Sequence, residues 1–399
     1  MKENRLKHLD KFWCDSNGNI KILMAEHAAI ESTFKVGCNH YVKLFSEDKN
    51  TKIFYLSGPV SLFHLFLYRK SKNIKNRFKI WLNNGKYHKN NLFEYIPLTL
   101  FPIHNLIPLN SKWVINNNLR YTLPPLKRIL TNKKFNKVDI LFIGDVIFHS
   151  LLDIIDAKLT IYRITDDISF FNNLPNYLKY IEEKVIKKAD IVIVTSKTLL
   201  NKVKKIRKNN VYYIPNGADF EHFYHSEIIT PEEYKNIPSP RIVYVGAIEK
   251  WFDVNLLKFC AEKLPNYSFV IIGPPKIKLS ILSPYKNVFI LGPKDYSLIP
   301  SYLKNSDVGI IPFKKIEGID SVSPIKLYEY MACGLPVVSV EWEELKNSPA
   351  FLAKNKYEFV EMIEEALRLD NNSKSKFIEF AKENTWESRF YKIKKLLGL

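Results

Sequence analysis

Residues 321–339 read SVSPIKLYEYMACGLPVVS and place a helix directly before a strand. Ser323 and Pro324 predict the helix start, because serine satisfies free backbone N–H groups as an N-cap and proline is preset for the first helical position. Gly334 ends this helix, and the apolar residues after Pro336 predict a buried strand. The stretch is therefore one helix–strand step of an α/β domain.

The same alternation of strands and helices extends through the rest of the chain. Short apolar, β-rich runs are separated by helix-like segments, and the rhythm restarts at residue 241. Runs of this kind are typical of parallel strands that are buried on both faces of a sheet. The sequence therefore predicts an α/β protein with two tandem doubly wound (Rossmann-like) domains that face a cleft. The predicted strands of the first half are 20–25, 52–57, 139–144, 159–164, 190–196 and 211–215.

A polar stretch with three prolines at 221–240 sets the expected domain boundaries. We expect residues 1–220 to form an N-terminal domain, 221–240 a linker and 241–385 a C-terminal domain. The final segment, 386–399, is more than the second domain needs. We therefore expect it to form a helix that crosses back to the first domain.

The positive charge of the chain lies in its first half. The 399 residues carry a formal net charge of +19, and residues 1–220 contain 36 Lys and Arg against 18 Asp and Glu. Basic clusters at 69–89 and 202–208, with aromatic segments at 61–68 and 93–109, suit an anionic membrane surface. A merely solvated basic face is the alternative. The mixed composition, 46% hydrophobic, excludes a disordered chain.

The cysteines and the apolar runs bear on the compartment. Cys14, Cys38, Cys260 and Cys333 are far apart, which favours free thiols in a reducing cytosol. The first residues lack the apolar stretch of a signal peptide, and no run of 18 apolar residues occurs. We expect a cytoplasmic protein that is peripherally associated with the inner face of the membrane.

The helix start at Ser323, Pro324 and Ile325 predicts a diphosphate site. Free amides and the positive end of the helix dipole attract anions there. Lys326 falls in the first turn, where a cation is unfavourable unless an anion is present. Glu329, three residues on and on the same face, is placed to accept hydrogen bonds from both hydroxyls of a ribose. An ordinary amphipathic helix with a Lys–Glu pair is the alternative.

The run SPIKLYEYMACGLPVV resembles the GT-B glycosyltransferases, specifically the large group around family 4. The resemblance implies that the C-terminal domain binds a nucleotide sugar and the N-terminal domain its acceptor. It implies that Lys326 holds the donor diphosphate, that Glu329 holds the ribose, and that Gly246 leaves room for the nucleotide sugar. The supporting stretches are YVGAI at 244–248, ADIVIVTS at 189–196 and PNGAD at 215–219.

One departure from this group concerns the mechanism. Its retaining members usually carry two glutamates eight positions apart, and the first position here is Ser321. A closer resemblance is to the membrane-associated glucuronosyltransferase of xanthan assembly, whose Y-R-x-S-D motif is similar to YRITD at 162–166. This resemblance implies that Asp166 is the catalytic base of an inverting transfer, with Asp167 as the fallback.

The residues alone give Asp166 a weaker case. It follows a predicted parallel strand, at the edge where open α/β sheets place ligands, and an inverting transferase needs one carboxylate to accept the proton of the acceptor hydroxyl. Simple capping of the next helix is the alternative. His27, His40 and Arg163 are further candidates on the acceptor side, and structural roles for the two histidines remain open.

The metal and cofactor signals are weak. His222 and His225 have an H-x-x-H spacing without further ligands, and no D-x-D triplet occurs. We therefore expect no metal and no cofactor, with the nucleotide sugar as substrate.

Together these patterns predict a metal-independent glycosyltransferase. It would move a sugar from a nucleotide donor, expected to be UDP-linked, to a lipid-diphosphate-linked glycan in surface polysaccharide biosynthesis. The alternatives are a retaining transferase that uses Glu317 or Asp320, a nucleotide-sugar epimerase and, from a different class, a basic nucleic-acid-binding protein. We expect no nucleic-acid partner.

Overall fold

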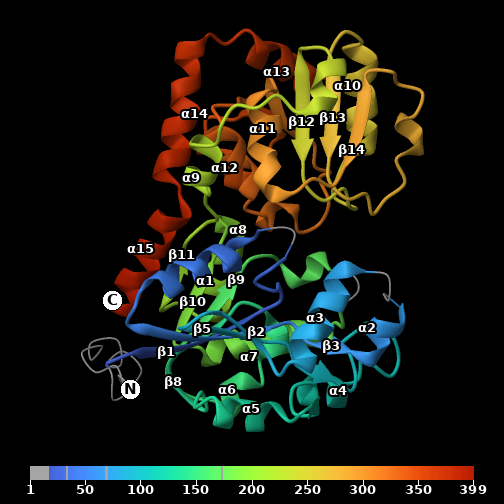
Figure 1. Ribbon diagram of the computed structural model, residues 1–399. Coiled ribbons are helices and arrows are strands. Elements are labelled where there is room, and N and C mark those ends of the chain that lie inside the picture. Colours follow the sequence, from blue (N-terminus) through green and yellow to red (C-terminus); the bar gives the residue numbers. More distant parts are fainter. Residues whose placement is uncertain (1–17, 33–34, 68–70, 172–173) are drawn as a thin grey trace. The chain divides into compact units, whose positions relative to one another are not determined.

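The computed structural model describes residues 18–32, 35–67, 71–171 and 174–399 (Figure 1). Cys14 and, from the first basic cluster, Arg69 and Lys70 lie outside the described residues. The chain divides into two compact units. Unit 1 comprises residues 1–215 and 390–399, and unit 2 comprises residues 216–389.

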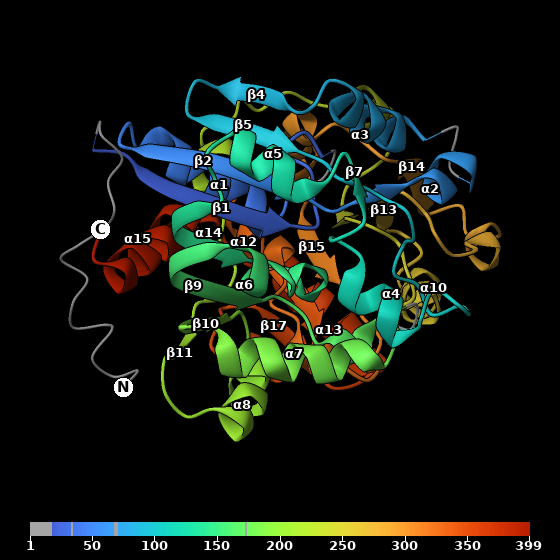
Figure 2. The same cartoon turned by 90° about the horizontal axis from the view of Figure 1, so that it is seen from below.

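Unit 1 is built on an eight-stranded sheet with the strand order β11-β10-β9-β8-β1-β2-β5-β4. All neighbouring strands are parallel except β4, which pairs antiparallel with β5 at one edge (Figure 2). The central strands are buried almost completely, because helices pack on both faces. The strands are β1 (Ile20–Glu26), β2 (Thr51–Ser57), β4 (Lys86–Lys89), β5 (Leu92–Tyr95), β8 (Lys137–Ile143), β9 (Asp156–Ile164), β10 (Ile191–Val194) and β11 (Val211–Tyr213).

A small three-stranded sheet accompanies the large one in unit 1. Its strands β3 (Val60–Ser61), β6 (Leu98–Thr99) and β7 (Thr122–Leu123) lie in the order β3-β6-β7. The helices and short 3₁₀ turns of the unit are α1 (Gly37–Glu47), α2 (Leu62–Leu67), α3 (Lys72–Leu82), α4 (Lys112–Asn117), α5 (Leu126–Asn132), η2 (Val146–Phe148), α6 (Leu151–Ile154), η3 (Ile168–Phe170), α7 (Tyr177–Lys188) and α8 (Lys197–Ile206).

Unit 2 contains one six-stranded sheet, β14-β13-β12-β15-β16-β17, in which every pair is parallel. Residues 221–240, expected as a linker, belong to this unit, where α9 and η4 form. The strands are β12 (Arg241–Val245), β13 (Ser268–Ile272), β14 (Val288–Gly292), β15 (Val308–Ile311), β16 (Val337–Val340) and β17 (Phe351–Ala353).

Four helices of unit 2 lie close to the helix-like segments of the sequence at 253–264, 296–304, 324–333 and 356–369, whereas α9 and α14 were not predicted. The helices and 3₁₀ turns are α9 (Phe220–Tyr224), η4 (Glu232–Asn236), α10 (Val254–Lys263), η5 (Ser280–Leu282), η6 (Tyr296–Leu298), α11 (Ile299–Lys304), η7 (Ile319–Ser321), α12 (Ile325–Ala332), η8 (Glu343–Leu345), α13 (Lys356–Leu367), α14 (Asn371–Glu383) and α15 (Trp386–Leu397).

The prediction of an α/β fold with two doubly wound parallel sheets is confirmed. The β4–β5 hairpin and the three-stranded sheet were not predicted. Strand β4 (KYHK) has no apolar run, and β3, β6 and β7 have only two residues each. Of the helices that the structure describes, none is both long enough and apolar enough to cross a bilayer.

The end of α15 packs on α1 within unit 1. The rings of Phe390 and Phe45 meet edge to face, with 4.6 Å between their centroids. Lys394, one turn further along α15, pairs with Asp48 at 3.6 Å. The final ten residues are thus held to unit 1 by an aromatic contact and an ion pair.

We expect Phe390→Ala to lower the free energy of unfolding of unit 1 by about 2 kcal/mol, because a half-buried ring is lost from the face of α1. Urea denaturation monitored by circular dichroism measures this. The matched control is Tyr391→Ala, whose ring is 69% exposed and should matter little. Equal effects of the two substitutions would contradict the contact.

Candidate functional site

The start of α12 is tied to the loop at residues 216–219. The backbone N–H of Asn216 donates to Ser323 Oγ at 3.2 Å, and Asn216 Nδ2 donates to the Ser323 carbonyl at 2.7 Å. The prediction that Ser323 is the N-cap is wrong, because Pro324 occupies that position and caps through no side-chain hydrogen bond. The Ser323 hydroxyl serves Asn216 instead, so α12 begins without a side-chain cap.

Lys326 lies in the first turn of α12, half-buried, with its ammonium group between two aromatic rings. Lys326 Nζ is 5.4 Å from the centroid of Tyr244 and 5.6 Å from that of Phe313. Among the described residues it has no hydrogen-bond or ion-pair partner. Burial lowers its pKa, although Glu329 opposes this. An anion that reached this ammonium would gain a charge-assisted contact in partly dehydrated surroundings.

Gly246 provides the space for this lysine. It follows β12 with a φ of +145°, a conformation that side chains rarely adopt, and its N–H donates to the carbonyl of Ile272 at 2.8 Å. A Cβ at this position would overlap the end of the Lys326 side chain. The glycine therefore brings bare backbone next to the ammonium group, as the close approach of a ligand requires.

Glu329 lies one turn further along α12 than Lys326. Burial raises the pKa of its carboxyl to about 7, Lys326 lowers it, and Asp219 raises it further. Asp219 accepts a hydrogen bond from Tyr296 Oη at 3.3 Å. Two carboxylates and one tyrosine hydroxyl are thus within electrostatic reach of each other beside Lys326, and together they offer several hydrogen-bonding groups to a polyhydroxyl ligand.

The loop that carries Asp219 is fixed by the last part of unit 2. Arg389 is buried, and its Nε donates to the carbonyl of Asn216 at 3.3 Å. The N–H of Ala218 donates to the carbonyl of Asn384 at 2.9 Å. The motif PNGAD at 215–219 contains Asp219, but the sequence alone gave this residue no role. No sequence pattern pointed to Tyr296.

The two residues considered for a retaining mechanism lie elsewhere on this segment. Glu317 and Asp320 are exposed, and Asp320 lies in η7. Ser321, at the position of the missing glutamate, is buried, and its hydroxyl donates to the carbonyl of Gly318 at 2.5 Å. Nothing in this geometry aims either carboxylate at Lys326.

In unit 1, three adjacent strands bring charged groups to the carboxyl edge of the sheet. Ala25 of β1 is opposite Ile143 of β8, which is opposite Tyr162 of β9. The next residues, Glu26, Gly144 and Arg163, therefore form a row across the sheet. The carboxylate of Glu26 fills the space that a Cβ on Gly144 would take. Gly144 thus allows a carboxylate to sit above the end of the middle strand.

Glu26 is a buried carboxyl group, only 4% exposed, that sequence reasoning missed. Burial raises its pKa to about 8, Arg163 lowers it and Asp145 raises it further. Its Oε1 atom has no hydrogen-bond partner among the described residues. The available signal was a single acid closing an otherwise apolar strand, IKILMAE at 20–26. At neutral pH the raised pKa keeps this carboxyl mainly protonated.

Asp166 and Asp167 differ sharply in their surroundings. Asp167 caps η3: its Oδ1 accepts hydrogen bonds from Ser169 N at 2.9 Å and Ser169 Oγ at 2.6 Å, and it pairs with Lys202 at 2.9 Å. These bonds lower its pKa. Burial raises the pKa of Asp166, which Thr165 and Arg163 lower in part. Asp166 is the stronger base of the two, and the capping role belongs to its neighbour.

The other acceptor-side candidates occupy different environments in unit 1. His27 has a side chain 79% exposed, and its Nδ1 lies 3.4 Å from Asp145. His40 is buried in α1. Arg163 is also buried, 5.1 Å from the ring centroid of Tyr41, and it attracts both Glu26 and Asp166. It therefore acts on these carboxyl groups from within the core.

No group of three or more histidine, cysteine, aspartate or glutamate side chains in the described part of the chain is arranged to hold a metal ion. His222 stacks on Tyr296 with 4.5 Å between centroids and a 12° interplanar angle, and His225 pairs with Glu221 at 3.4 Å. The H-x-x-H pair is thus occupied by other contacts. Metal independence stays a prediction.

Comparison with known proteins agrees with this geometry. Residues 239–369, which contain Gly246, Lys326 and Glu329, match the family model described as glycosyl transferases group 1. A Bacillus subtilis (strain 168) protein named as a teichuronic acid biosynthesis glycosyltransferase, TuaH, is 27% identical over 200 residues, 46% of this chain and 48% of that protein. The chain spans about half the length of the curated relatives it matches.

Solved structures show the fold over 95% of the chain. Sucrose-phosphate synthase from Thermosynechococcus elongatus aligns with a TM-score of 0.67 at 14% identity, covering 95% of this chain and 98% of that one. Anabaena Alr3699/HepE in complex with UDP and glucose aligns with a TM-score of 0.65 at 13% identity, covering 95% and 100%. The chain has the GT-B fold. It is similar in sequence to group 1 glycosyl transferases.

The buried carboxyl of Glu26 predicts a pH-dependent stability. Because its folded pKa is near 8 and the usual value is 4.5, the folded state holds a proton that the unfolded state has lost between these values. Stability from this group is present at low pH and is lost as the pH rises toward 8. Glu26→Gln should therefore gain stability relative to the native chain between pH 5 and pH 8, as urea denaturation at both values measures.

Glu31→Gln is the control, because the Glu31 side chain is 57% exposed. The stability of this variant relative to the native chain should change little between the two pH values. A Glu26→Gln difference that is the same at both pH values would show that Glu26 titrates normally.

Proposed function

We propose that this protein transfers a sugar from a UDP-linked donor, bound by unit 2, to an acceptor bound by unit 1. The observation that carries the proposal is Lys326, a half-buried ammonium at a helix start that forms no hydrogen bond or ion pair with the described residues. A diphosphate would supply the missing negative charge, and the N-terminal end of the helix would add to its binding.

Several observations support a UDP-linked donor. Glu329 and Asp219 lie beside Lys326 and suit the hydroxyl groups of a ribose or a sugar. The solved structure of Anabaena HepE, which has the same fold, was obtained with UDP and glucose. The matched family segment contains both α12 and Gly246. In the proposed complex Lys326 contacts the diphosphate and Glu329 the ribose.

For the chemical step we propose Asp166 as the general base of an inverting transfer. Its carboxylate takes the proton of the acceptor hydroxyl while the hydroxyl oxygen bonds to the anomeric carbon and the bond to the UDP oxygen breaks. The raised pKa of Asp166 supports this role, as does the similarity of YRITD at 162–166 to the xanthan glucuronosyltransferase motif. Arg163 would keep Asp166 ionised. Asp167 pairs with Lys202 and stays the fallback base.

The proposed leaving-group stabilisation needs no divalent ion. Lys326 and the amides at the start of α12 would neutralise the charge that develops on the UDP oxygen. We therefore propose metal-independent transfer without a cofactor.

We propose a lipid-diphosphate-linked glycan of surface polysaccharide assembly as the acceptor, reached from the inner face of the membrane. The relative named for teichuronic acid biosynthesis supports this class of product. The excess of basic residues in the first 220 residues would favour an anionic leaflet and a lipid diphosphate.

Lys326→Ala should weaken UDP binding more than tenfold, about 1.4 kcal/mol, because the charge partner of the diphosphate is lost. Isothermal titration calorimetry with UDP, and with GDP, CDP and ADP for comparison, measures it. Lys286→Ala, an exposed lysine in the same unit, is the control and should bind UDP normally. If no nucleotide binds the native chain, the donor proposal fails.

Asp166→Asn should lower the transfer rate at least about a hundredfold while UDP binding is kept, because only the proton acceptor is removed. The assay uses UDP sugars and a lipid-diphosphate acceptor in excess EDTA, where the native chain should keep its full rate. Asp167→Asn is the neighbouring control and should retain transfer. Product with the donor's anomeric configuration, or donor consumption without acceptor, would overturn the inverting mechanism or the transfer itself.

A further inference from the structure

The three-stranded sheet of unit 1 brings apolar side chains to one edge. Strand β3 runs parallel to β6, with Ser61 opposite Thr99, so Leu62 and Leu100 follow at the same end of the sheet. Strand β7 runs antiparallel, with Thr122 opposite Thr99, and Leu100 N donates to the carbonyl of Tyr121 at 3.3 Å. Leu62, Leu100 and Tyr121 therefore emerge together from the sheet.

Several large apolar side chains in the sequence after Leu100 are exposed to solvent. Ile107 is 88% exposed, more than any other large apolar residue that the structure describes, and Leu106 beside it is 57% exposed. Exposed apolar side chains mark an interaction site where several of them gather in one patch. We name the group the 100–121 surface, and it consists of Leu100, Phe101, Leu106, Ile107, Trp113 and Tyr121.

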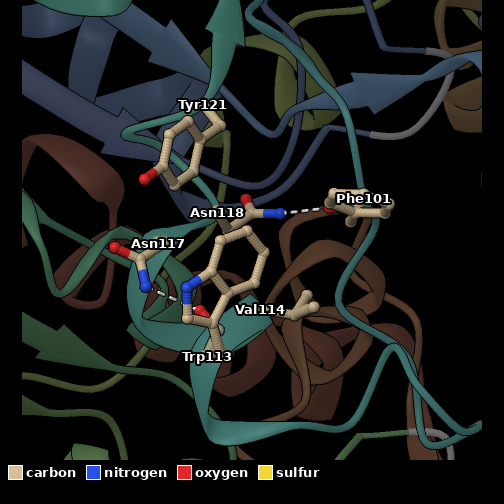
Figure 3. Close-up of a pocket in the computed structure, with 6 residues that line it drawn as sticks. All are labelled: Phe101, Trp113, Val114, Asn117, Asn118 and Tyr121. Atoms are coloured by element: carbon tan, nitrogen blue, oxygen red, sulfur yellow. Dashed lines mark hydrogen bonds between the residues drawn. The ribbon is translucent and has the colours of Figure 1, made fainter.

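An aromatic cluster forms the fixed part of the 100–121 surface. Trp113 of α4 stacks on Tyr121 with 5.4 Å between centroids and a 21° angle, and Phe101 meets Trp113 edge to face at 6.2 Å (Figure 3). Asn118 Nδ2 donates to the Phe101 carbonyl, and Asn117 Nδ2 donates to the Trp113 carbonyl at 2.9 Å. The three rings are thus held in place while about half of each remains exposed.

The segment that carries this surface is rich in basic residues and almost free of acids. From residue 49 to residue 138 the chain contains 17 Lys and Arg and a single acid, Glu94. Glu94 is completely buried, where it accepts hydrogen bonds from Ser57 at 2.6 Å and Ile30 at 3.0 Å. This segment therefore exposes no carboxylate. Lys112 and Arg120, next in sequence to Trp113 and Tyr121, are exposed.

We infer that the 100–121 surface docks on an anionic lipid bilayer, with Leu106 and Ile107 inserted among the acyl chains and Trp113 and Tyr121 at the level of the headgroups. Stacked tryptophan and tyrosine rings suit this interface, because each is apolar with one polar group. Lys112 and Arg120 meet the anionic headgroups. The inference rests on the proposed function and deepens it, because it names the surface that would bring unit 1 to the membrane that holds a lipid-linked acceptor.

The combination of groups favours a bilayer over nucleic acid. Contacts to phosphate need only the basic residues, whereas two exposed aliphatic side chains gain nothing from a solvated phosphate backbone. A bilayer uses both, since buried CH₂ groups and basic residues near an anionic surface each add to the binding free energy. An anionic bilayer is therefore the occupant that accounts for the whole surface.

Co-sedimentation of the full chain with vesicles tests the inference. The native chain should bind mixed phosphatidylglycerol–phosphatidylcholine vesicles and bind pure phosphatidylcholine vesicles much more weakly. Leu106→Asn with Ile107→Asn should lower the partition coefficient more than tenfold without changing the net charge. Lys112→Gln with Arg120→Gln should lower it by a similar factor and should remove most of its salt dependence.

Matched controls lie outside the surface. Ile228 and Ile229 in unit 2 form a second exposed pair, 72% and 60% exposed, so Ile228→Asn with Ile229→Asn has the same chemistry at another place. Lys278 and Lys286 of unit 2 are exposed and lie outside the basic clusters of the first half, so their change to Gln matches the basic pair. Both controls should bind vesicles like the native chain. A control that loses as much binding as its partner variant would overturn the inference.

Tryptophan fluorescence tests the depth of insertion. Vesicles with brominated acyl chains should quench the native chain, and Trp113→Phe should remove that quenching while vesicle binding is largely kept. Quenching that persists in Trp113→Phe would place insertion elsewhere and overturn the inference.

Other occupants give distinct results. Two results without vesicle binding would overturn the inference. If the native chain self-associates in analytical ultracentrifugation and the Leu106→Asn, Ile107→Asn variant does not, a second copy covers the surface. If the native chain and this variant both bind single-stranded DNA tightly, the partner is nucleic acid. UDP binding separates the two proposals. A variant that loses vesicle binding and still binds UDP shows that only the surface is changed. If the native chain does not bind UDP, the proposed function fails, whatever the vesicle result.

Discussion

A half-buried lysine that forms no hydrogen bond or ion pair with the described residues is the constraint on which the helix start of unit 2 depends. Lys326 Nζ lies between the rings of Tyr244 and Phe313, and bare backbone at Gly246 closes over it. Such a charge is costly unless the surroundings hold it in place. The Asn216–Ser323 hydrogen bonds, and Arg389 behind Asn216, fix the helix start that presents this lysine. The same contacts place Asp219 within reach of Glu329.

In unit 1 a glycine likewise makes room for a buried ionisable group, which is here an acid. Gly144 leaves room at the carboxyl edge of the sheet for the Glu26 carboxyl, and burial keeps that group mainly protonated at neutral pH. The buried guanidinium of Arg163 attracts Glu26 and Asp166 together. Removal of Arg163 would therefore change the protonation of both carboxyl groups.

The basic residues of unit 1 fall into two groups, those buried beside carboxylates and those exposed at the surface. Arg163 and Lys202 are partly or fully buried and set the ionisation of particular carboxylates. The segment 49–138 contains exposed basic residues and exposed apolar side chains, and its single acid, Glu94, is buried. A soluble domain gains nothing from that combination, whereas a bilayer surface matches both of its parts. The net charge of +19 alone does not distinguish these roles.

The sequence by itself determined the α/β class, most of the strands and the positions of Lys326 and Glu329 on one helix face, because apolar periodicity and helix punctuation are local properties. It could not predict the hydrogen bond from Asn216 to Ser323, because these residues are 107 positions apart. The ion pair of Asp167 likewise depends on Lys202, 35 positions away. Glu26, Asp219 and Tyr296 acquired their environments only when distant strands and loops came together. Tertiary structure decided these points because burial and charge pairing depend on proximity in space, which a local sequence pattern does not encode.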